Sequence, residues 1–286
     1  MADNDFLERI ALNERFISFT RMSTTSANYY HWHQCLEILF VRRGYGIVIV
    51  DNQQYTLRPG RMFIFPPFKL HKVYVEQGPA NPYERTTLHI ENVVIDTALQ
   101  PFPKRRAIFR QLCDTQSLAR IYDLSEHSDH LDYLLENFHT LCRHGTHQLE
   151  DIVVLVLQLM AFMPEQGVHH HAFPHTTATK VMNWIEENYD CKFSLERLAQ
   201  AVGLSRSYTS RVFSQETGGS IQEYLVTRRV KCACELLRGT DLTIEQIGQK
   251  SGFADTPYFI TSFKKLIGQT PLQYRKTSCH PDPRLT

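Results

Sequence analysis

The fold of this chain is decided by two related segments, SLERLAQAVGLS (residues 194–205) and LTIEQIGQKSGFAD (residues 242–255). In the first segment, apolar side chains recur at helical spacing behind Ser194, which is a natural N-cap. Gly203 then stands where a helix can end with a positive φ, and a further helix starts at about Arg206. The segment therefore predicts a helix, a glycine-centred turn and a second helix that runs to about Glu216.

The second segment repeats this pattern 49 residues later, and beyond the turn the offset becomes 50. Corresponding residues are Leu195 and Ile244, Leu198 and Ile247, Ala199 and Gly248, Gly203 and Gly252, Tyr208 and Tyr258, Phe213 and Phe263, and Gly218 and Gly268. Small residues at Ala199 and Gly248 are expected because two short helices that cross at a steep angle leave little room inside the turn. The repeat predicts two helix-turn-helix motifs in tandem.

The stretch between the motifs, residues 221–241, has apolar residues at helical spacing and predicts one long connecting helix. About 18 helical residues span about 27 Å, which is close to the roughly 34 Å between successive major-groove faces of B-DNA. The sequence pattern of a single motif is equally compatible with two packed helices of an ordinary helical bundle. Two motifs in tandem, joined at this distance, favour a domain that reads duplex DNA.

The candidates for contact with bases are the N-terminal residues of the second helix of each motif. In the first copy these are Arg206, Ser207, Ser210 and Arg211, and in the second they are Thr256, Pro257, Ile260 and Thr261. Guanidinium and hydroxyl groups can hydrogen-bond to base edges, so the first copy is equipped for direct readout. The second copy would depend on apolar contact with thymine methyls or on DNA shape. We therefore expect specificity to be concentrated in the first half-site.

The segments LSRSYTSRVFSQETG (204–218) and GFADTPYFITSFKKLIGQTPLQYRK (252–276) resemble the AraC/XylS family of bacterial transcription regulators. The resemblance implies a cytoplasmic transcription regulator, either an activator or a repressor, that acts as a homodimer on double-stranded promoter DNA with RNA polymerase. The family's base-contacting positions correspond to Ser207, Ser210 and Arg211. Residues that would face phosphates or solvent are Lys264, Lys265 and Arg228. The second copy departs from the family in lacking its frequent arginine, although Pro257 suits the first helical turn.

Length and composition are consistent with two domains. The chain has 286 residues, of which 42% are hydrophobic, and its net charge is +1. The charge is unevenly distributed, because 15 basic and 11 acidic side chains follow residue 175, against 16 and 19 before it. The longest apolar run, residues 152–163, is shorter than the roughly 20 residues that cross a bilayer and predicts a buried helix. The N-terminus does not resemble a secretory signal, so we expect an intracellular protein without a membrane partner.

The first half of the chain changes character along its length. Residues from about 16 to 95 contain short β-branched runs separated by Gly, Asn and Pro, which predicts strands, and the periodicity then becomes helical. The expected fold class is α+β with two domains. Its parts are a β-barrel over residues 1–103, a helical segment over 104–163 that is a candidate for dimerisation, a linker over 164–177, and an all-α DNA-binding domain over 178–286 with two helix-turn-helix motifs joined by a long helix.

A spaced set of polar residues predicts a site inside this barrel. The first cupin motif, HxHx₃Ex₆G, is matched by His31, His33, Glu37 and Gly44. Gly60, Pro66 and His71 resemble the second cupin motif, but Phe68 stands where that motif usually has glycine. The barrel is therefore expected to be cupin-like. In an extended strand, residues 31, 33, 35 and 37 point to one face, and His71 could complete a set of three histidines and one carboxylate.

Two interpretations of this set stay open. It could hold an iron, manganese, nickel or zinc ion, as in a metal-dependent cupin enzyme or a metal-responsive regulator. The favoured interpretation is that the same groups bind an organic effector or one another, with no metal or other cofactor, because the second motif is degraded. The effector-binding residues are then His31, His33, Glu37, Phe65 and His71. The linker histidines at 169–171 are interpreted as solvated rather than metal-binding.

Aromatic side chains are dense in the same region, and one or two could stack on a sugar ring. The sugar-responsive members of the resembling family make a carbohydrate the leading interpretation of the effector, and carbohydrate metabolism the regulated process. The sequence contains no nucleophilic triad pattern, P-loop or GxGxxG, so we expect a regulator and not an enzyme. Effector binding would shift the chain between two states that differ in affinity for DNA.

Overall fold

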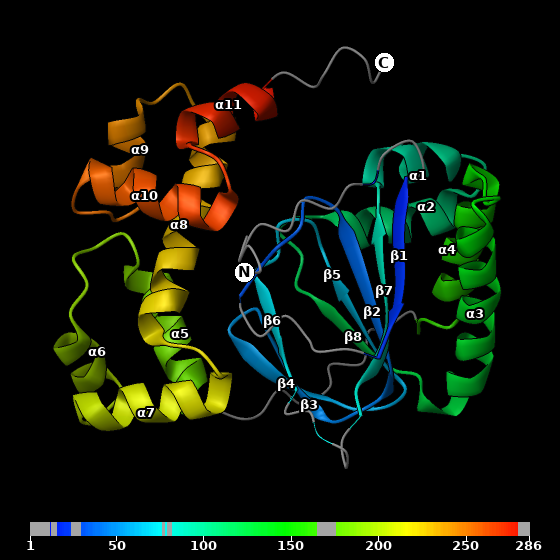
Figure 1. The fold of residues 1–286 in the computed structure, drawn as a ribbon, viewed down its shortest axis with the longest axis horizontal. Coiled ribbons are helices and arrows are strands. Elements are labelled where there is room, and N and C mark those ends of the chain that lie inside the picture. Colours follow the sequence, from blue (N-terminus) through cyan, green and yellow to red (C-terminus); the bar gives the residue numbers. More distant parts are fainter. Residues whose placement is uncertain are drawn as a thin grey trace. The chain divides into compact units, whose positions relative to one another are not determined.

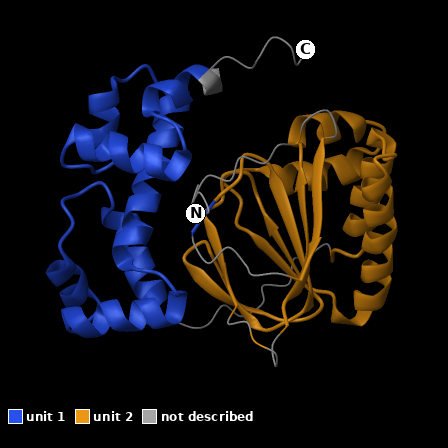
Figure 2. Ribbon diagram, in the orientation of Figure 1, with its two compact units in different colours: residues 1–8, 29–31, 175–286 blue, residues 9–28, 32–174 orange. Residues whose placement is uncertain are grey.

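The computed structural model describes Leu12, Gly78 and residues 16–23, 30–75, 82–164 and 176–279, and the chain divides into two compact units (Figure 2). We call the first the β domain, which comprises the described residues up to 164 except Tyr30 and His31. The second is the helical domain, which comprises residues 176–279, and Tyr30 and His31 group with it. The linker histidines at 169–171 lie outside the described residues.

The β domain contains two antiparallel sheets, as Figure 1 shows. The larger sheet has the order β1 (Ile17–Met22), β7 (Glu84–Ile90), β2 (Leu36–Arg43), β5 (Arg61–Phe65) and β8 (Arg120–Asp123). The smaller sheet has the order β4 (Gln53–Leu57), β3 (Gly46–Val50) and β6 (His71–Tyr74). The β-branched runs of the sequence thus form strands, which confirms the β-rich N-terminal region.

Both faces of the larger sheet are buried, because successive side chains of a strand point in opposite directions. Ile38 and Phe40 of β2 belong to a core shared with the helices of the β domain. Leu39 belongs to a second core, together with Val48 and Val73 of the smaller sheet. We call the space between the two sheets the inter-sheet interior.

Helices cover the other face of the larger sheet (Figure 1). They are α1 (Asn92–Ala98), α2 (Pro103–Cys113), α3 (Ser128–His144), which follows the short 3₁₀ helix η2 (Ser125–His127), and α4 (Leu149–Ala161). The apolar run of the sequence forms α4, where Ile152, Leu155 and Leu159 are almost fully buried, as predicted. None of the helices in the described part of the chain has both the length and the hydropathy of a membrane span.

One strand lies inside the region that the sequence predicts to be helical. β8 pairs antiparallel with β5 at the edge of the larger sheet, with Arg61 opposite Asp123 and Ile64 opposite Arg120. The prediction of a helical segment over residues 104–163 is therefore wrong at β8. A run of four residues is too short for its periodicity to distinguish a strand from part of a helix.

The helical domain follows the predicted repeat. Its helices are α5 (Thr177–Asn188), α6 (Leu195–Ala201), α7 (Arg206–Thr217), α8 (Ile221–Gly239), α9 (Ile244–Lys250), α10 (Thr256–Ile267) and α11 (Pro271–Cys279). The four motif helices are capped at their N-termini by the side chains of Ser194, Ser205, Thr243 and Asp255. The connecting helix α8 has 19 residues, about 28 Å at 1.5 Å per residue, and it packs against helices of both motifs.

The turn glycines differ in how tightly they are enclosed. Gly203 and Gly252 both have positive φ, at +74° and +88°. A Cβ atom at Gly203 would meet no other residue within 4 Å, whereas one at Gly252 would lie 2.3 Å from the carbonyl oxygen of Tyr189. A Cβ at Gly248 would lie 2.9 Å from the ring of Phe259, which confirms the need for a small residue there. The turn of the second motif is therefore the more closely packed.

Candidate nucleic-acid interface and buried polar site

The N-terminal half of α7 presents polar side chains to solvent. Arg206, Ser207 and Arg211 are exposed and Ser210 is half-buried. These residues lie three to five positions apart or adjacent along the helix, so they form one surface over its first two turns. The guanidinium of Arg211 lies 5.3 Å from the ring centroid of Tyr208, which helps to hold it along the helix. The structure thus brings the four predicted residues of the first copy together.

The matching surface of α10 has different chemistry. Its first two turns carry the predicted residues, of which Pro257 and Thr261 are exposed and Thr256 and Ile260 are half-buried. Pro257 lies in the first helical turn, as expected. The exposed basic residues of α10 are Lys264 and Lys265 in its last turn, where α7 carries the exposed Ser214 and Gln215. Hydrogen-bonding groups therefore begin α7, whereas positive charges end α10.

Two exposed aromatic side chains were missed as candidate contacts. Tyr208 is 44% exposed and Tyr258 is 46% exposed, although both are large and partly apolar. They occupy corresponding positions near the start of α7 and α10. The repeat already paired them in the sequence, but the sequence alone could not separate an exposed tyrosine from a core one.

Arg228 does not face phosphates or solvent, which corrects the expectation from the family resemblance. Its Nε donates to a carboxylate oxygen of Glu186 at 2.7 Å, and its guanidinium lies 4.0 Å from the ring centroid of Tyr189. The neighbouring Arg229 is buried and donates to the carbonyl oxygens of Tyr189 and Cys191 at 2.6 and 2.8 Å. The two arginines join α8 to α5 and to the chain that follows it. Their role is to support the domain from within.

A second candidate site lies in the inter-sheet interior. Glu37 shares the orientation of Leu39 on β2, so its carboxylate points between the sheets. His89 is the direct cross-strand partner of Glu37 in the larger sheet, and His71 begins β6 of the smaller sheet. His33 precedes β2, and the chain bends at residues 34 and 35 instead of continuing as a strand. The predicted same-face residues thus converge through a bend and not through one extended strand.

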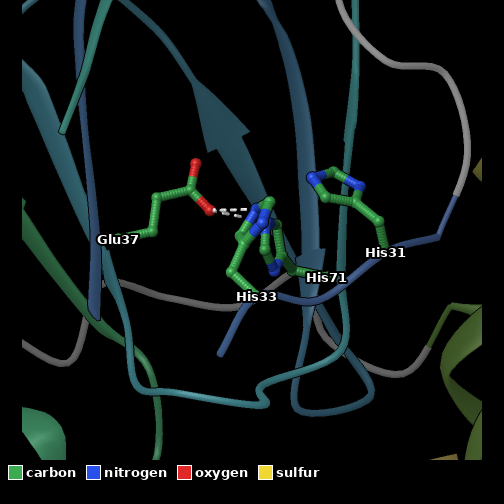
Figure 3. A group of neighbouring side chains, drawn as sticks. All are labelled: His31, His33, Glu37 and His71. Carbon is green, nitrogen blue, oxygen red and sulfur yellow. Dashed lines mark ion pairs between the residues drawn. The ribbon is translucent and has the colours of Figure 1, made fainter. Parts of the chain in front are cut away.

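Figure 3 shows the side chains of His31, His33, Glu37 and His71, with the ion pairs of His33 and His71 to Glu37 as dashed lines. The Nε2 atoms of His33 and His71 lie 2.9 and 3.0 Å from the same oxygen, Oε2 of Glu37. The potential ligand atoms of His31, His33, Glu37 and His71 all lie within 4.8 Å of one another, and the four residues are buried. Burial alone would raise the pKa of Glu37, but the neighbouring His71 and His33 hold it well below its usual value. The Glu37 side chain is therefore a carboxylate at neutral pH.

His89 is a member of this group that the sequence analysis missed. Its Nε2 lies 3.8 Å from Oε2 of Glu37, and its ring centroid lies 4.5 Å from that of His33. Burial lowers the pKa of His89 to about 4, so the ring is neutral at neutral pH. The signal was the alternation in β7, where Leu88 and Ile90 face the helices and His89 faces the opposite way.

Two phenylalanines shape the surroundings of His71. Phe65 is buried and stacks on the His71 ring, with centroids 4.0 Å apart and planes within 6°. Phe68 stands where the cupin motif has glycine, and it adopts the left-handed region with φ of +61°. Its N–H donates to the carbonyl oxygen of His33 at 2.7 Å. The turn that favours glycine is thus formed in spite of the substitution.

Two family models match this chain. A model of the AraC-like ligand binding domain matches residues 17–151, and a helix-turn-helix domain model matches residues 198–277. The chain belongs to the AraC family of transcriptional regulators. This AraC-family regulator is therefore a DNA-binding protein with a ligand-binding domain, as the resemblance in the sequence implied.

Two relatives are similar to this AraC-family regulator over most of its length, and a solved DNA-binding domain is similar to part of it. The uncharacterised HTH-type transcriptional regulator YfiF of Bacillus subtilis is 25% identical over 90% of this chain and 81% of that protein. The Msm operon regulatory protein of Streptococcus mutans is 28% identical over 84% of this chain and 83% of that protein. The solved DNA-binding domain of AdpA, in complex with a target DNA, is 28% identical over 36% of this chain and 95% of that chain, with a TM-score of 0.34.

Proposed function

We propose that this regulator recognises its operator chiefly through α7, while α10 mainly adds attraction to the phosphate backbone. The observation that carries the proposal is the contrast between the exposed Arg206, Ser207 and Arg211 at the start of α7 and the exposed Lys264 and Lys265 at the end of α10. Hydrogen-bonding side chains in the major groove distinguish bases, whereas lysines attract phosphates whatever the sequence. The first half-site would then set specificity and the second would add affinity.

The β domain would control this binding through a small-molecule effector. The residues proposed to bind it are His31, His33, Glu37, Phe65 and His71. The sugar-responsive members of the family favour a carbohydrate, and a polar group beside stacked aromatic rings suits a sugar. An effector that binds one of two states more tightly would change the occupancy of the promoter. We propose a regulatory and not a catalytic role for the chain.

A homodimer is the proposed assembly. Exposed apolar side chains on two helices of the β domain support it, because such residues commonly form interfaces between protein subunits. They are Tyr133 and Leu141 on α3 and Val154 on α4. Two linked helical domains would then act on double-stranded promoter DNA together with RNA polymerase, in the cytoplasm of a bacterium.

Selection of bound duplexes from a random pool by the full chain tests the DNA-binding part of the proposal. We expect a bipartite site in which the half-site read by α7 is the more strictly defined. A variant with Arg211→Ala should relax that half-site, and Thr261→Ala should change the selected sequence little. Failure to enrich any sequence would contradict the proposal, and so would relaxation confined to the Thr261→Ala variant.

A thermal-shift screen of the full chain against sugars and other small metabolites tests the effector. A ligand at 100 times its Kd stabilises the state that binds it by about 2.7 kcal/mol, which is readily measured. The hit should be a carbohydrate, and Phe65→Leu should weaken its binding while leaving the selected DNA sequence unchanged. A hit from another chemical class, or one that Phe65→Leu does not affect, would contradict this effector site.

A further inference from the structure

The position of the His71 ring restricts where its protons lie. Nδ1 of His71 lies 2.9 Å from the carbonyl oxygen of Lys69. Because a carbonyl oxygen can only accept, Nδ1 carries a hydrogen and donates it. Nε2 of the same ring faces Oε2 of Glu37 at 3.0 Å. Nε2 of His71 therefore either carries a second proton or presents its lone pair.

The carboxylate oxygen opposite this ring has three imidazole neighbours. Besides Nε2 of His71, Oε2 of Glu37 has Nε2 of His33 at 2.9 Å and Nε2 of His89 at 3.8 Å. Neither ring nitrogen of His89 forms a hydrogen bond within the described part of the chain. A second proton on His71 would stabilise only the contact between His71 and Glu37. It would not account for the positions of His33 and His89 beside the same oxygen. A metal cation among the donor atoms would be ligated by several of them at once.

We propose that His31, His33, Glu37 and His71 bind one divalent transition-metal ion. Their potential ligand atoms lie within 4.8 Å of one another, and each residue is at most 5% exposed. Imidazole nitrogens with one carboxylate suit zinc, iron, cobalt or nickel, whereas magnesium and calcium prefer oxygen ligands. The hydrogen bond from Nδ1 of His71 to a backbone carbonyl is the outer contact usual for a metal-ligating histidine. His89, with its Nε2 3.8 Å from Oε2 of Glu37, would lie beside such an ion as a fourth imidazole.

This ion deepens the proposed function, on which it rests for its regulatory role. A six-coordinate ion with four protein ligands has two positions left, and neighbouring hydroxyl oxygens of a carbohydrate could occupy both. The metal would then be part of the effector site and would not make the chain an enzyme.

Metal content of the intact full chain tests the site directly. The chain is stripped with a chelator, given Zn²⁺ or Co²⁺, separated from free ions and analysed for bound metal. We expect one ion per chain and a Co²⁺ absorption spectrum of a nitrogen- and oxygen-ligated site. Glu37→Gln and His71→Gln should each lower the affinity by about 100-fold or more. The matched control is a chain with the linker substitutions His169→Ala, His170→Ala and His171→Ala. It should bind the metal ion with the affinity of the unmodified chain.

A second measurement needs no variant and so does not depend on whether one folds. In ¹⁵N-labelled unmodified chain, Zn²⁺ should shift the Nε2 resonance of His71 and leave Nδ1 protonated. A His71 ring that carries protons on both nitrogens and does not respond to Zn²⁺ would overturn the proposal, as would metal binding that disappears in the linker control. Sequence selection on DNA is measured separately: its failure in a metal-loaded chain would contradict the proposed function and not the metal site.

Discussion

The two helix-turn-helix motifs share a backbone plan but present different surfaces. Both have a side-chain N-cap on each helix, a turn glycine with positive φ and a reading helix that ends at a left-handed glycine. α7 carries two exposed arginines in its first two turns and the exposed, uncharged Ser214 and Gln215 in its last turn, whereas α10 begins with Thr256 and Pro257 and carries two exposed lysines in its last turn. The repeat therefore determines where each helix lies, and a few exposed side chains determine what it can do on DNA.

The largest expected effect separates the two turns. Gly252→Ala should destabilise the second motif by about 3 kcal/mol, because it adds a positive-φ penalty to an overlap with the carbonyl oxygen of Tyr189. Gly203→Ala should cost only about 1 kcal/mol, since no other residue lies near the added Cβ. Hydrogen exchange of the amides of α6 and α9 measures both losses. Equal losses at the two sites would show that the difference in packing has no energetic weight.

The next effect separates the two reading helices. Arg211→Ala should weaken binding to the operator by about 1 to 3 kcal/mol, because it removes a side chain that hydrogen-bonds to a base. Binding to scrambled DNA should weaken much less. The corresponding Thr261→Ala should cost less than about 1 kcal/mol on the operator. Fluorescence anisotropy with both duplexes at one fixed salt concentration gives these values. If Arg211→Ala weakens both duplexes equally, that arginine contacts phosphates and the two helices are alike.

The smallest effect concerns the ends of the same helices. Lys264→Ala and Lys265→Ala should each weaken binding to the operator and to scrambled DNA by the same factor. Each should also lower the magnitude of the slope of log K against log salt concentration by about 1. The matched controls are Ser214→Ala and Gln215→Ala at the corresponding positions of α7, which carry no charge and should leave the slope unchanged. Titrations at several salt concentrations decide the matter. If the loss of affinity depends on the DNA sequence, these lysines of α10 contact bases and not only the phosphate backbone.

The parts of the fold that the sequence predicted are those specified by neighbouring residues. N-caps, turn glycines and apolar spacing act within one or two helical turns, so the tandem motifs and the buried α4 were predicted. β8 was missed because its four residues become a strand only by pairing with β5. Arg228 was misplaced because its partner, Glu186, lies 42 residues away on α5.

The buried polar site was predicted in part for the same reason. His31, His33 and Glu37 are close in sequence, so their spacing alone indicated a common site. His89 joins them only because β7 lies beside β2 in the larger sheet, in a register that sets it opposite Glu37. That register is determined by the packing of the whole β domain and leaves no local signal apart from the alternation of β7.

The uninterrupted helix α8 has a consequence for the genetics of the operator. Its 19 residues join the two motifs, and Arg229 fixes it to the chain after α5 through two backbone carbonyls. One additional base pair between the half-sites would displace the second by about 3.4 Å and rotate it by about 35° around the duplex. A rigid helix cannot follow that rotation. Insertions of a single base pair at the centre of the operator should therefore be as harmful as substitutions in the half-site itself.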